Sequence, residues 1–220
     1  MSHLNNILVE FFVIIHNFVS SIITNPNYSY GVAIIFVTLI IKLILLPLNI
    51  KSMRSSIRIN EIQPEIQKIQ KKYKNDPQRL QQEQMKLYKE YNINPFGSCL
   101  PLLLQWPILI ALYYVFNNIQ GISGITFLWI KDLASPDIFL AVLAGATQYY
   151  AGLLMNPKGD SAQSKTASNM NLSMSIMMIF ISSRLKAALV IYWVTSNLIQ
   201  MGQTILTKKL EQKHSINKNA

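Results

Sequence analysis

The sequence predicts an all-α integral membrane protein. Half of its 220 residues are apolar and only 14% are charged, against about a quarter in an ordinary soluble domain. Several apolar stretches approach the ~20 residues that an α-helix needs to cross a bilayer. Residues 49–94 carry ten of the 20 basic side chains and five of the ten acidic ones. These observations predict a five-span helical bundle with one large polar excursion, rather than a nucleic-acid-binding globule with its charge on a soluble face.

The apolar stretches and turn signals give the order of elements. We expect an outer amphipathic helix and turn over 1–27, spans over 28–49, 95–117, 138–156, 171–183 and 187–207, a cytoplasmic helical hairpin over 50–94, an outer loop over 118–137, a cytoplasmic loop over 157–170, an outer turn over 184–186 and a basic cytoplasmic tail over 208–220. The fourth span is short, because its eleven apolar residues cover only about 17 Å. It is therefore continued by its polar flank, 168–171, or lies where the bilayer is thinned or hydrated.

The distribution of Lys and Arg predicts the orientation of the spans. Sixteen basic residues fall in the hairpin, in the connection at 156–171 and in the tail, whereas Lys131, Arg184 and Lys186 fall on the opposite side. This distribution predicts a multi-pass protein of the plasma membrane with a cytoplasmic C-terminus and an extracytoplasmic N-terminus.

The N-terminal segment, 4–24, is apolar with a polar stripe at helical spacing: Asn6, Glu10, Asn17, Ser21 and Thr24. This pattern predicts a helix that lies in the outer interface before the turn at 25–27. The alternative is that this segment forms a sixth span. The orientation of the later spans rests on the basic residues after residue 30, so it is the same in either case and does not decide between them. The segment is a poor signal peptide, since no basic residue precedes the apolar run and no small-residue cleavage pattern follows it.

The polar segment over 50–94 is predicted to form an antiparallel helical hairpin. Its first apolar stripe runs through Ile59, Ile62, Ile66, Ile69 and Tyr73, and its second through Leu80, Leu87, Tyr88 and Tyr91. A turn over 74–77 separates the two helices, and Pro64 interrupts the first. The simplest interpretation of the basic surface is a solvated, topology-determining face; the alternative is contact with anionic lipids, ribosomal RNA or a partner protein.

Lys42 is the leading candidate for a functional residue. An ionised Lys within a span costs about 2.5 to 3.5 kcal/mol on insertion scales, which makes it functional by default; snorkelling to the headgroups is the alternative. Lys42 shares a narrow arc of a helical wheel with Gly31, Thr38 and Asn49. No acidic residue lies within any span, so its partner must come from elsewhere. The polar residues in the other spans that could face it are Gln105, Thr147, Gln148, Ser173, Ser175, Ser196 and Gln200.

The sequence argues against several function classes. All three His lie outside the five spans, which disfavours a zinc protease or a Ser/His hydrolase. A proton-coupled transporter usually needs an intramembrane acid, and a channel needs a ring or filter. The single Cys99 allows no intramolecular disulfide. We expect no catalytic site, metal or cofactor.

The motifs resemble those of YidC-type membrane protein insertases. The run from Asn94 through Pro101 into Gln105-Trp106-Pro107 and Tyr113 resembles their second core span, and 41–48 resembles the first. The segments 63–73 and 189–198 resemble the first hairpin helix and the last span. The resemblance covers about residues 28–206 and implies a monomeric protein that inserts nascent membrane proteins without nucleotide hydrolysis, alone or beside the Sec translocon.

The resemblance also implies a hydrophilic groove that is open to cytoplasm and lipid and closed outside. Its basic residue corresponds to Lys42, and we expect the groove to be lined by Thr38, Lys42, Asn49, Gln105, Thr147, Gln148, Trp193, Ser196 and Gln200. The basic hairpin and tail are candidate contacts for the ribosome. Family members usually carry Arg where this chain has Lys42, and an aromatic-Pro turn where it has Leu185-Lys186.

The chain best resembles a minimal Gram-positive-type member of that family. It lacks the large periplasmic domain of Gram-negative relatives, and Cys99 cannot serve as the lipidated N-terminus of a lipoprotein. Two other functions stay open from the sequence. One is a small-solute transporter or channel, and the other is a structural assembly factor that binds membrane subunits through its hairpin.

Overall fold

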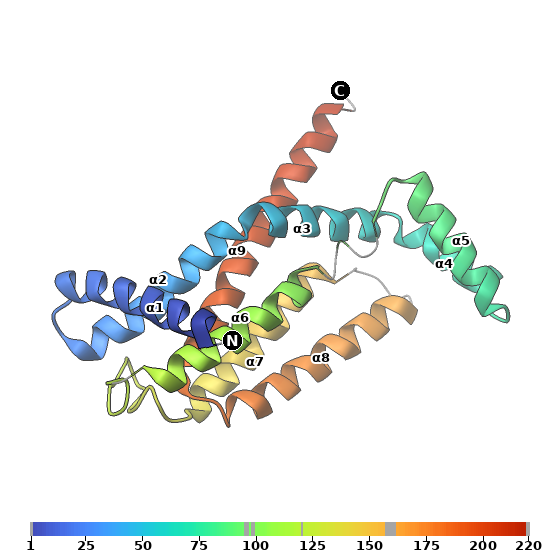
Figure 1. The fold of residues 1–220 in the computed structure, drawn as a ribbon. Coiled ribbons are helices and arrows are strands. Elements are labelled where there is room, and N and C mark those ends of the chain that lie inside the picture. The colour runs from blue at the N-terminus through green and yellow to red at the C-terminus, as the bar shows by residue number, and fades with distance from the viewer. Residues whose placement is uncertain (1, 95–96, 98–99, 120, 157–161, 219–220) are drawn as a thin grey trace.

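The computed structural model describes residues 2–94, 97, 100–119, 121–156 and 162–218. Within these ranges all regular secondary structure is helical (Figure 1), apart from one isolated bridge between Phe127 and Ile130. The helices are α1 (Ser2–Ile22), α2 (Pro26–Ile44), α3 (Leu46–Glu61), α4 (Gln63–Lys72), α5 (Pro77–Glu90), α6 (Leu100–Asn118), α7 (Ile138–Met155), α8 (Ala162–Ser182) and α9 (Ala187–Lys218). The predicted all-α class is confirmed; Cys99 lies outside the described residues.

Local signals start most of these helices. Proline occupies the first turn of α2, α3, α4 and α5, where its missing N–H costs no hydrogen bond. The side chains of Asn25, Asp76 and Asp137 cap α2, α5 and α7 by accepting backbone N–H groups of the first turn. The polar turn residues of the sequence therefore set the helix boundaries.

The main core lies around α9, which packs against α2, α3, α6 and α7. The largest fully buried side chains are Tyr192 of α9, Phe12 of α1 and Phe116 of α6. Phe12 meets Phe116 edge to face at 5.6 Å between ring centroids, which joins α1 to α6. The His16 and Tyr30 rings, 3.8 Å apart, join α1 to α2. Helix α9 thus contacts four other helices of the bundle, and α1 is joined to α2 and α6.

The polar segment between α2 and α6 contains three helices, α3, α4 and α5. The sequence predicted a hairpin of two helices over 50–94. The first helix, α3, packs on α9 and belongs to the bundle. The helix breaks at Ile62, two residues before Pro64, because proline has no N–H to donate to the carbonyl four residues earlier and its ring clashes with that carbonyl. The hairpin proper is α4 and α5. A small core of Ile62, Ile66, Leu87 and Ile93 joins them, and the Tyr91 hydroxyl donates a hydrogen bond of 2.7 Å to Glu65.

Helix α8 has an inverted distribution of polarity. Its buried positions include Ser164, Asn171, Ser175 and Ser182, whereas its exposed positions include the large side chains Met170, Leu172, Ile176, Met177 and Phe180. The expected short span, 171–183, is the second half of this 21-residue helix. Among the buried polar residues, Asn171 faces α7 and donates a hydrogen bond of 3.0 Å to the Tyr149 carbonyl. An apolar exterior over a polar contact face is the arrangement that lipid favours.

Two helices of the described part, Pro26–Ile44 and Ile138–Met155, are long and apolar enough to cross a membrane. The segment Ile7–Ile22 is a shorter apolar helix. The count of five spans and the position of α1 at the outer interface stay predictions.

Candidate functional site

Lys42 lies in the last turn of α2 and is only 6% exposed. Thr38, which is fully buried, and Asn49, which is 8% exposed, flank it along the chain on either side of the helix break at Leu45. The Thr38 hydroxyl donates a hydrogen bond of 2.7 Å to the Ile34 carbonyl of its own helix. Within the described ranges, no side chain or carbonyl forms a hydrogen bond or ion pair with the Lys42 ammonium. The predicted stripe is therefore buried and carries an unpaired cation.

A second group of predicted residues joins α6 to α9. Gln105 Nε2 donates a hydrogen bond of 2.9 Å to the Tyr192 hydroxyl, and the Ser196 side chain lies beside the same hydroxyl. Tyr192 is 1% exposed. Gln105 and Ser196 were predicted from the sequence as polar residues in apolar spans. Tyr192 was not among the predicted groove residues, because a hydroxyl on an aromatic ring was its only signal.

A third group joins α7 to α9. Asn197 Nδ2 donates a hydrogen bond of 3.3 Å to Thr147 Oγ1, and the Thr147 hydroxyl in turn donates to the Leu143 carbonyl at 2.9 Å. Both side chains are buried. Asn197 was not among the predicted groove residues, although its amide in an apolar run, next to Ser196, was a usable signal.

The remaining predicted residues are Gln148, Trp193 and Gln200, all of which are half-buried. Trp193 packs against the main core, and the backbone carbonyl of Gln200 accepts a hydrogen bond from Thr204. In the described part of the chain, no hydrogen bond links Lys42 to any other predicted groove residue. Six of the nine predicted residues thus belong to the Lys42 stripe or to the polar junctions that α9 makes with α6 and with α7.

The segment 121–137 packs over one end of the bundle. Its side chains Ile122, Phe127, Ile130 and Leu133 are buried in the main core, and the Phe127 ring lies where a β-carbon on Gly31 would be. The carbonyls of Leu133 and Ser135 accept the backbone N–H groups of Ala188 and Ala187 at 3.1 and 3.0 Å, which satisfies the free N-terminus of α9. Lys186 donates to the Phe116 carbonyl at 3.0 Å and caps α6. This end of the bundle is closed by apolar side chains.

The opposite end of α7 is held by polar side chains from two other helices. Asn60 of α3 donates a hydrogen bond of 3.0 Å to the Met155 carbonyl, and the Lys208 ammonium of α9 donates to the Leu154 carbonyl. These carbonyls have no partner within α7 because they lie in its last turn. The contacts tie α3, α7 and α9 together close to Lys208.

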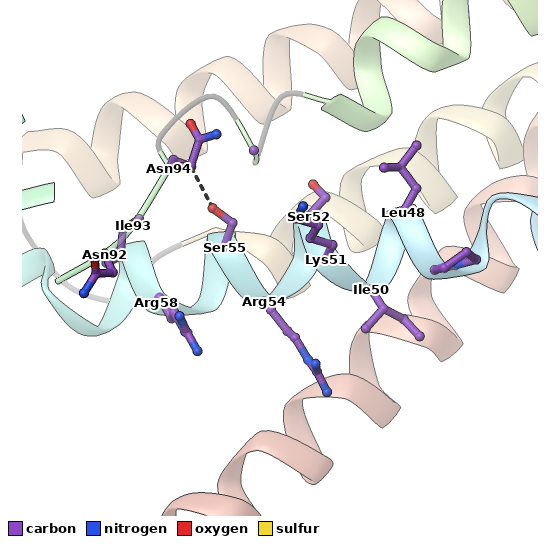
Figure 2. Close-up of a pocket in the computed structure, with 12 residues that line it drawn as sticks. Leu48, Ile50, Lys51, Ser52, Arg54, Ser55, Arg58, Asn92, Ile93 and Asn94 are labelled. Carbon is purple, nitrogen blue, oxygen red and sulfur yellow. Dashed lines mark hydrogen bonds between the residues drawn. The ribbon is translucent and has the colours of Figure 1, made fainter. Parts of the chain in front are cut away.

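A pocket of about 540 Å³ lies beside α3, between that helix and the segment that follows α5 (Figure 2). It is lined by Pro47, Leu48, Ile50, Lys51, Ser52, Arg54, Ser55, Arg58, Asn92, Ile93, Asn94 and Gly97. Lys42 is not one of its lining residues, so this pocket and the buried Lys42 stripe are separate features.

Comparisons with known proteins point to one family. A family model described as "60Kd inner membrane protein" matches residues 19–215. The "Membrane protein insertase YidC" of Clostridium tetani is 93% identical over the full length of both chains. The "Membrane protein insertase MisCA" of Bacillus subtilis is 40% identical over 82% of this chain and 70% of that protein. A solved structure, "Active YidC insertase crystal structure with the first transmembrane domain resolved", aligns with a TM-score of 0.69 and 31% identity. It matches 90% of this chain, which spans 44% of that one.

Proposed function

This chain belongs to the 60Kd inner membrane protein family and is a membrane protein insertase of the YidC type, and on that premise we propose that Lys42 receives the hydrophilic terminus of the protein being inserted. The groove that we propose opens to cytoplasm and lipid. The polar junctions at Tyr192 and Thr147 lie on helices that we expect to line it. No covalent step and no cofactor enter this mechanism.

The observation that carries the proposal is the burial of Lys42 without a partner in the described part of the chain. Removing one partner of a buried ion pair is strongly destabilising, so a resident cation without a counter-charge is retained at a cost. That cost is offset when an acidic group binds. At an effective dielectric constant near 20, opposite charges 4 Å apart attract by about 4 kcal/mol.

The closed end of the bundle supports a one-sided entry route. The buried side chains of Phe127, Ile130 and Leu133 fill the end that we place outside, so a polar terminus enters from the cytoplasm. The apolar segment of the substrate then moves sideways into lipid. Burial of about 20 apolar residues in hydrocarbon, with the membrane potential acting on an acidic tail, supplies the driving force.

The surface of α1 supports its proposed position at the outer interface. One face is buried through Phe12 and Val19. A second face exposes Ile7, Ile14, Phe18 and Ile22, and a third exposes Glu10, Asn17 and Ser21. A helix that meets protein, lipid and water on three sides fits the boundary of a bilayer better than its interior.

The other parts of the proposal concern partners and topology. We place the C-terminus in the cytoplasm and the protein in the plasma membrane, acting as a monomer, alone or beside the Sec translocon. The ribosome and anionic lipids are further candidate partners of the basic hairpin and tail. Of the tail lysines, Lys208 is engaged with the end of α7, which leaves the others as candidates for such contacts.

Insertion of an acidic-tailed single-span protein into proteoliposomes tests the role of Lys42. We expect Lys42→Arg to retain insertion and Lys42→Ala and Lys42→Glu to reduce it at least tenfold, because only the first keeps the charge. Lys131→Ala, an exposed lysine in the outer segment, is the matched control. Equal insertion by all variants would show that the charge of Lys42 has no role in insertion.

A further inference from the structure

The pocket beside α3 combines positive charge with hydrogen-bonding groups. Lys51, Arg54 and Arg58 follow one another at spacings of three and four, so they form one stripe on the helix. No acidic residue lines the pocket. Arg54 pairs with Glu211 of α9 at 2.8 Å, whereas Lys51 and Arg58 are exposed and form no ion pair within the described ranges. Two cations are therefore available to an anion.

The opposite wall of the pocket is polar and is fixed to α3. The Ser55 hydroxyl donates a hydrogen bond of 2.8 Å to the Asn94 carbonyl, as Figure 2 shows. Gly97 lies close enough that a β-carbon would come within 3.1 Å of Ser55 Oγ. The side chains of Ser52, Asn92 and Asn94 add further polar groups to the lining. The Ser55–Asn94 hydrogen bond therefore holds the backbone of Asn94 against α3 at the edge of the pocket.

The place of α3 in the chain sets the depth of the pocket in the membrane. The helix begins two residues after the end of α2, which we expect to be a span that ends at the cytoplasmic side. Pro47, Leu48 and Ile50 line the pocket near the end of that span, and the three cations follow. An apolar part followed by cations matches the boundary between acyl chains and headgroups.

We propose that this pocket binds the phosphate-bearing headgroup of an anionic lipid from the cytoplasmic leaflet. Lys51 and Arg58 pair with the phosphate, the polar wall meets the headgroup, and Leu48 and Ile50 meet the start of the acyl chains. A volume of about 540 Å³ lies within the ~300 to 1,000 Å³ range of small-molecule sites, which favours a lipid over a folded macromolecule. The site rests on the proposed orientation but is independent of the role of Lys42.

Lipid binding by the purified, delipidated full-length protein in detergent tests this site. Native mass spectrometry gives the apparent affinity for phosphatidylglycerol and for phosphatidylcholine as the control lipid. We expect wild type to prefer phosphatidylglycerol, and the double variant Lys51→Gln/Arg58→Gln to bind it at least tenfold more weakly. Lys71→Gln/Lys74→Gln removes the same charge from exposed positions of the hairpin and leaves the affinity unchanged.

Two further measurements separate the alternatives. The charge-retaining variant Lys51→Arg/Arg58→Lys binds phosphatidylglycerol within threefold of wild type, which shows that binding depends on the positive charge, and an unchanged thermal unfolding temperature of the Gln variant shows that its loss of binding is not a folding defect. Glycerol 3-phosphate at millimolar concentration does not displace the lipid. The proposal is overturned if both Gln variants weaken binding equally, if phosphatidylcholine binds as well, if glycerol 3-phosphate displaces the lipid, or if an acidic peptide is the only ligand held.

Discussion

Gln105 and Tyr192 are 87 residues apart in the chain and share a hydrogen bond of 2.9 Å between the amide of α6 and the phenol of α9. Because Tyr192 is buried, its hydroxyl has no water to replace Gln105. The bond fixes the position of α6 relative to the central helix of the bundle.

We expect Tyr192→Phe to destabilise the protein by about 1 kcal/mol, since it leaves the Gln105 amide unpaired. The coupling between Tyr192→Phe and Gln105→Leu should be about 0.6 kcal/mol, with an upper limit near 1.7, which is the range for polar pairs in membrane helices. Unfolding in mixed micelles measures both. Tyr113→Phe, at an exposed tyrosine of α6, should change nothing.

Gly152 permits the close approach of α7 and α8. A β-carbon there would overlap the side-chain amide of Asn171. We expect Gly152→Ala to destabilise the protein by about 1 to 3 kcal/mol, the usual cost of overpacking. Gly202→Ala in α9 is the matched control, because a β-carbon at that position meets no other atom within 4 Å. Equal stability of the two variants in thermal unfolding contradicts tight packing at this contact.

Lys208 and Lys209 are adjacent but have different surroundings. The ammonium of Lys208 donates to the Leu154 carbonyl at the end of α7, where the helix dipole adds to the attraction, whereas Lys209 is exposed. We expect Lys208→Ala to lower stability by about 1 to 3 kcal/mol and Lys209→Ala to have no effect. If the two residues serve only as tail charges, then both variants behave alike in unfolding and only ribosome co-sedimentation changes.

Asp132 organises the outer segment through its carboxylate. It accepts hydrogen bonds from the Gly124 and Ala134 amides, each at 2.9 Å, and from the Ser135 hydroxyl at 2.6 Å. Burial raises the pKa of Asp132, but these bonds, with the nearby charge of Lys186, outweigh burial and hold the pKa below its usual value.

A lowered pKa stabilises the fold above the pKa of the unfolded chain, about 4, and this contribution disappears as the pH falls through the folded value. We therefore expect the free energy of unfolding of Asp132→Asn to be lower than that of wild type at pH 7, by roughly 1 kcal/mol. This difference should disappear as the pH falls towards 3, because the wild-type carboxylate is then protonated. Limited proteolysis of the outer segment between pH 7 and pH 3 measures this. Glu10→Gln, at an exposed carboxylate of α1, serves as the control.

Local patterns in the sequence were sufficient to predict the helices and the buried stripe. The apolar periods, prolines and caps gave the helical class, and a wheel placed Thr38, Lys42 and Asn49 together, all of which are buried. The start of α8 was not predicted, because its first residues are polar and carry no span signal. Pro64 was predicted to interrupt the first hairpin helix, and the structure places the break two residues earlier, at Ile62.

Contacts between distant segments could not be read from periodicity. The packing of Phe127 against Gly31 joins residues nearly a hundred positions apart, and the meeting of Gln105, Ser196 and Tyr192 depends on how α6 crosses α9. Each polar residue in an apolar run is recognisable from the sequence by itself. Which of these residues form hydrogen bonds with each other, and which, like Lys42, have no partner in the described part of the chain, depends on how the helices pack.

The inverted polarity of α8 reverses the pattern of mutational tolerance known from soluble proteins. In the membrane position that we propose for α8, its large outward side chains, such as Ile176, Met177 and Phe180, would meet fluid lipid without fixed shape, so one apolar residue there could replace another freely. Its small inward side chains, Asn171, Ser175 and Ser182, meet another helix at close range and accept few substitutes. Among relatives, we expect substitutions in this helix to be most frequent at the bulky hydrophobic positions and least frequent at the serines and the asparagine.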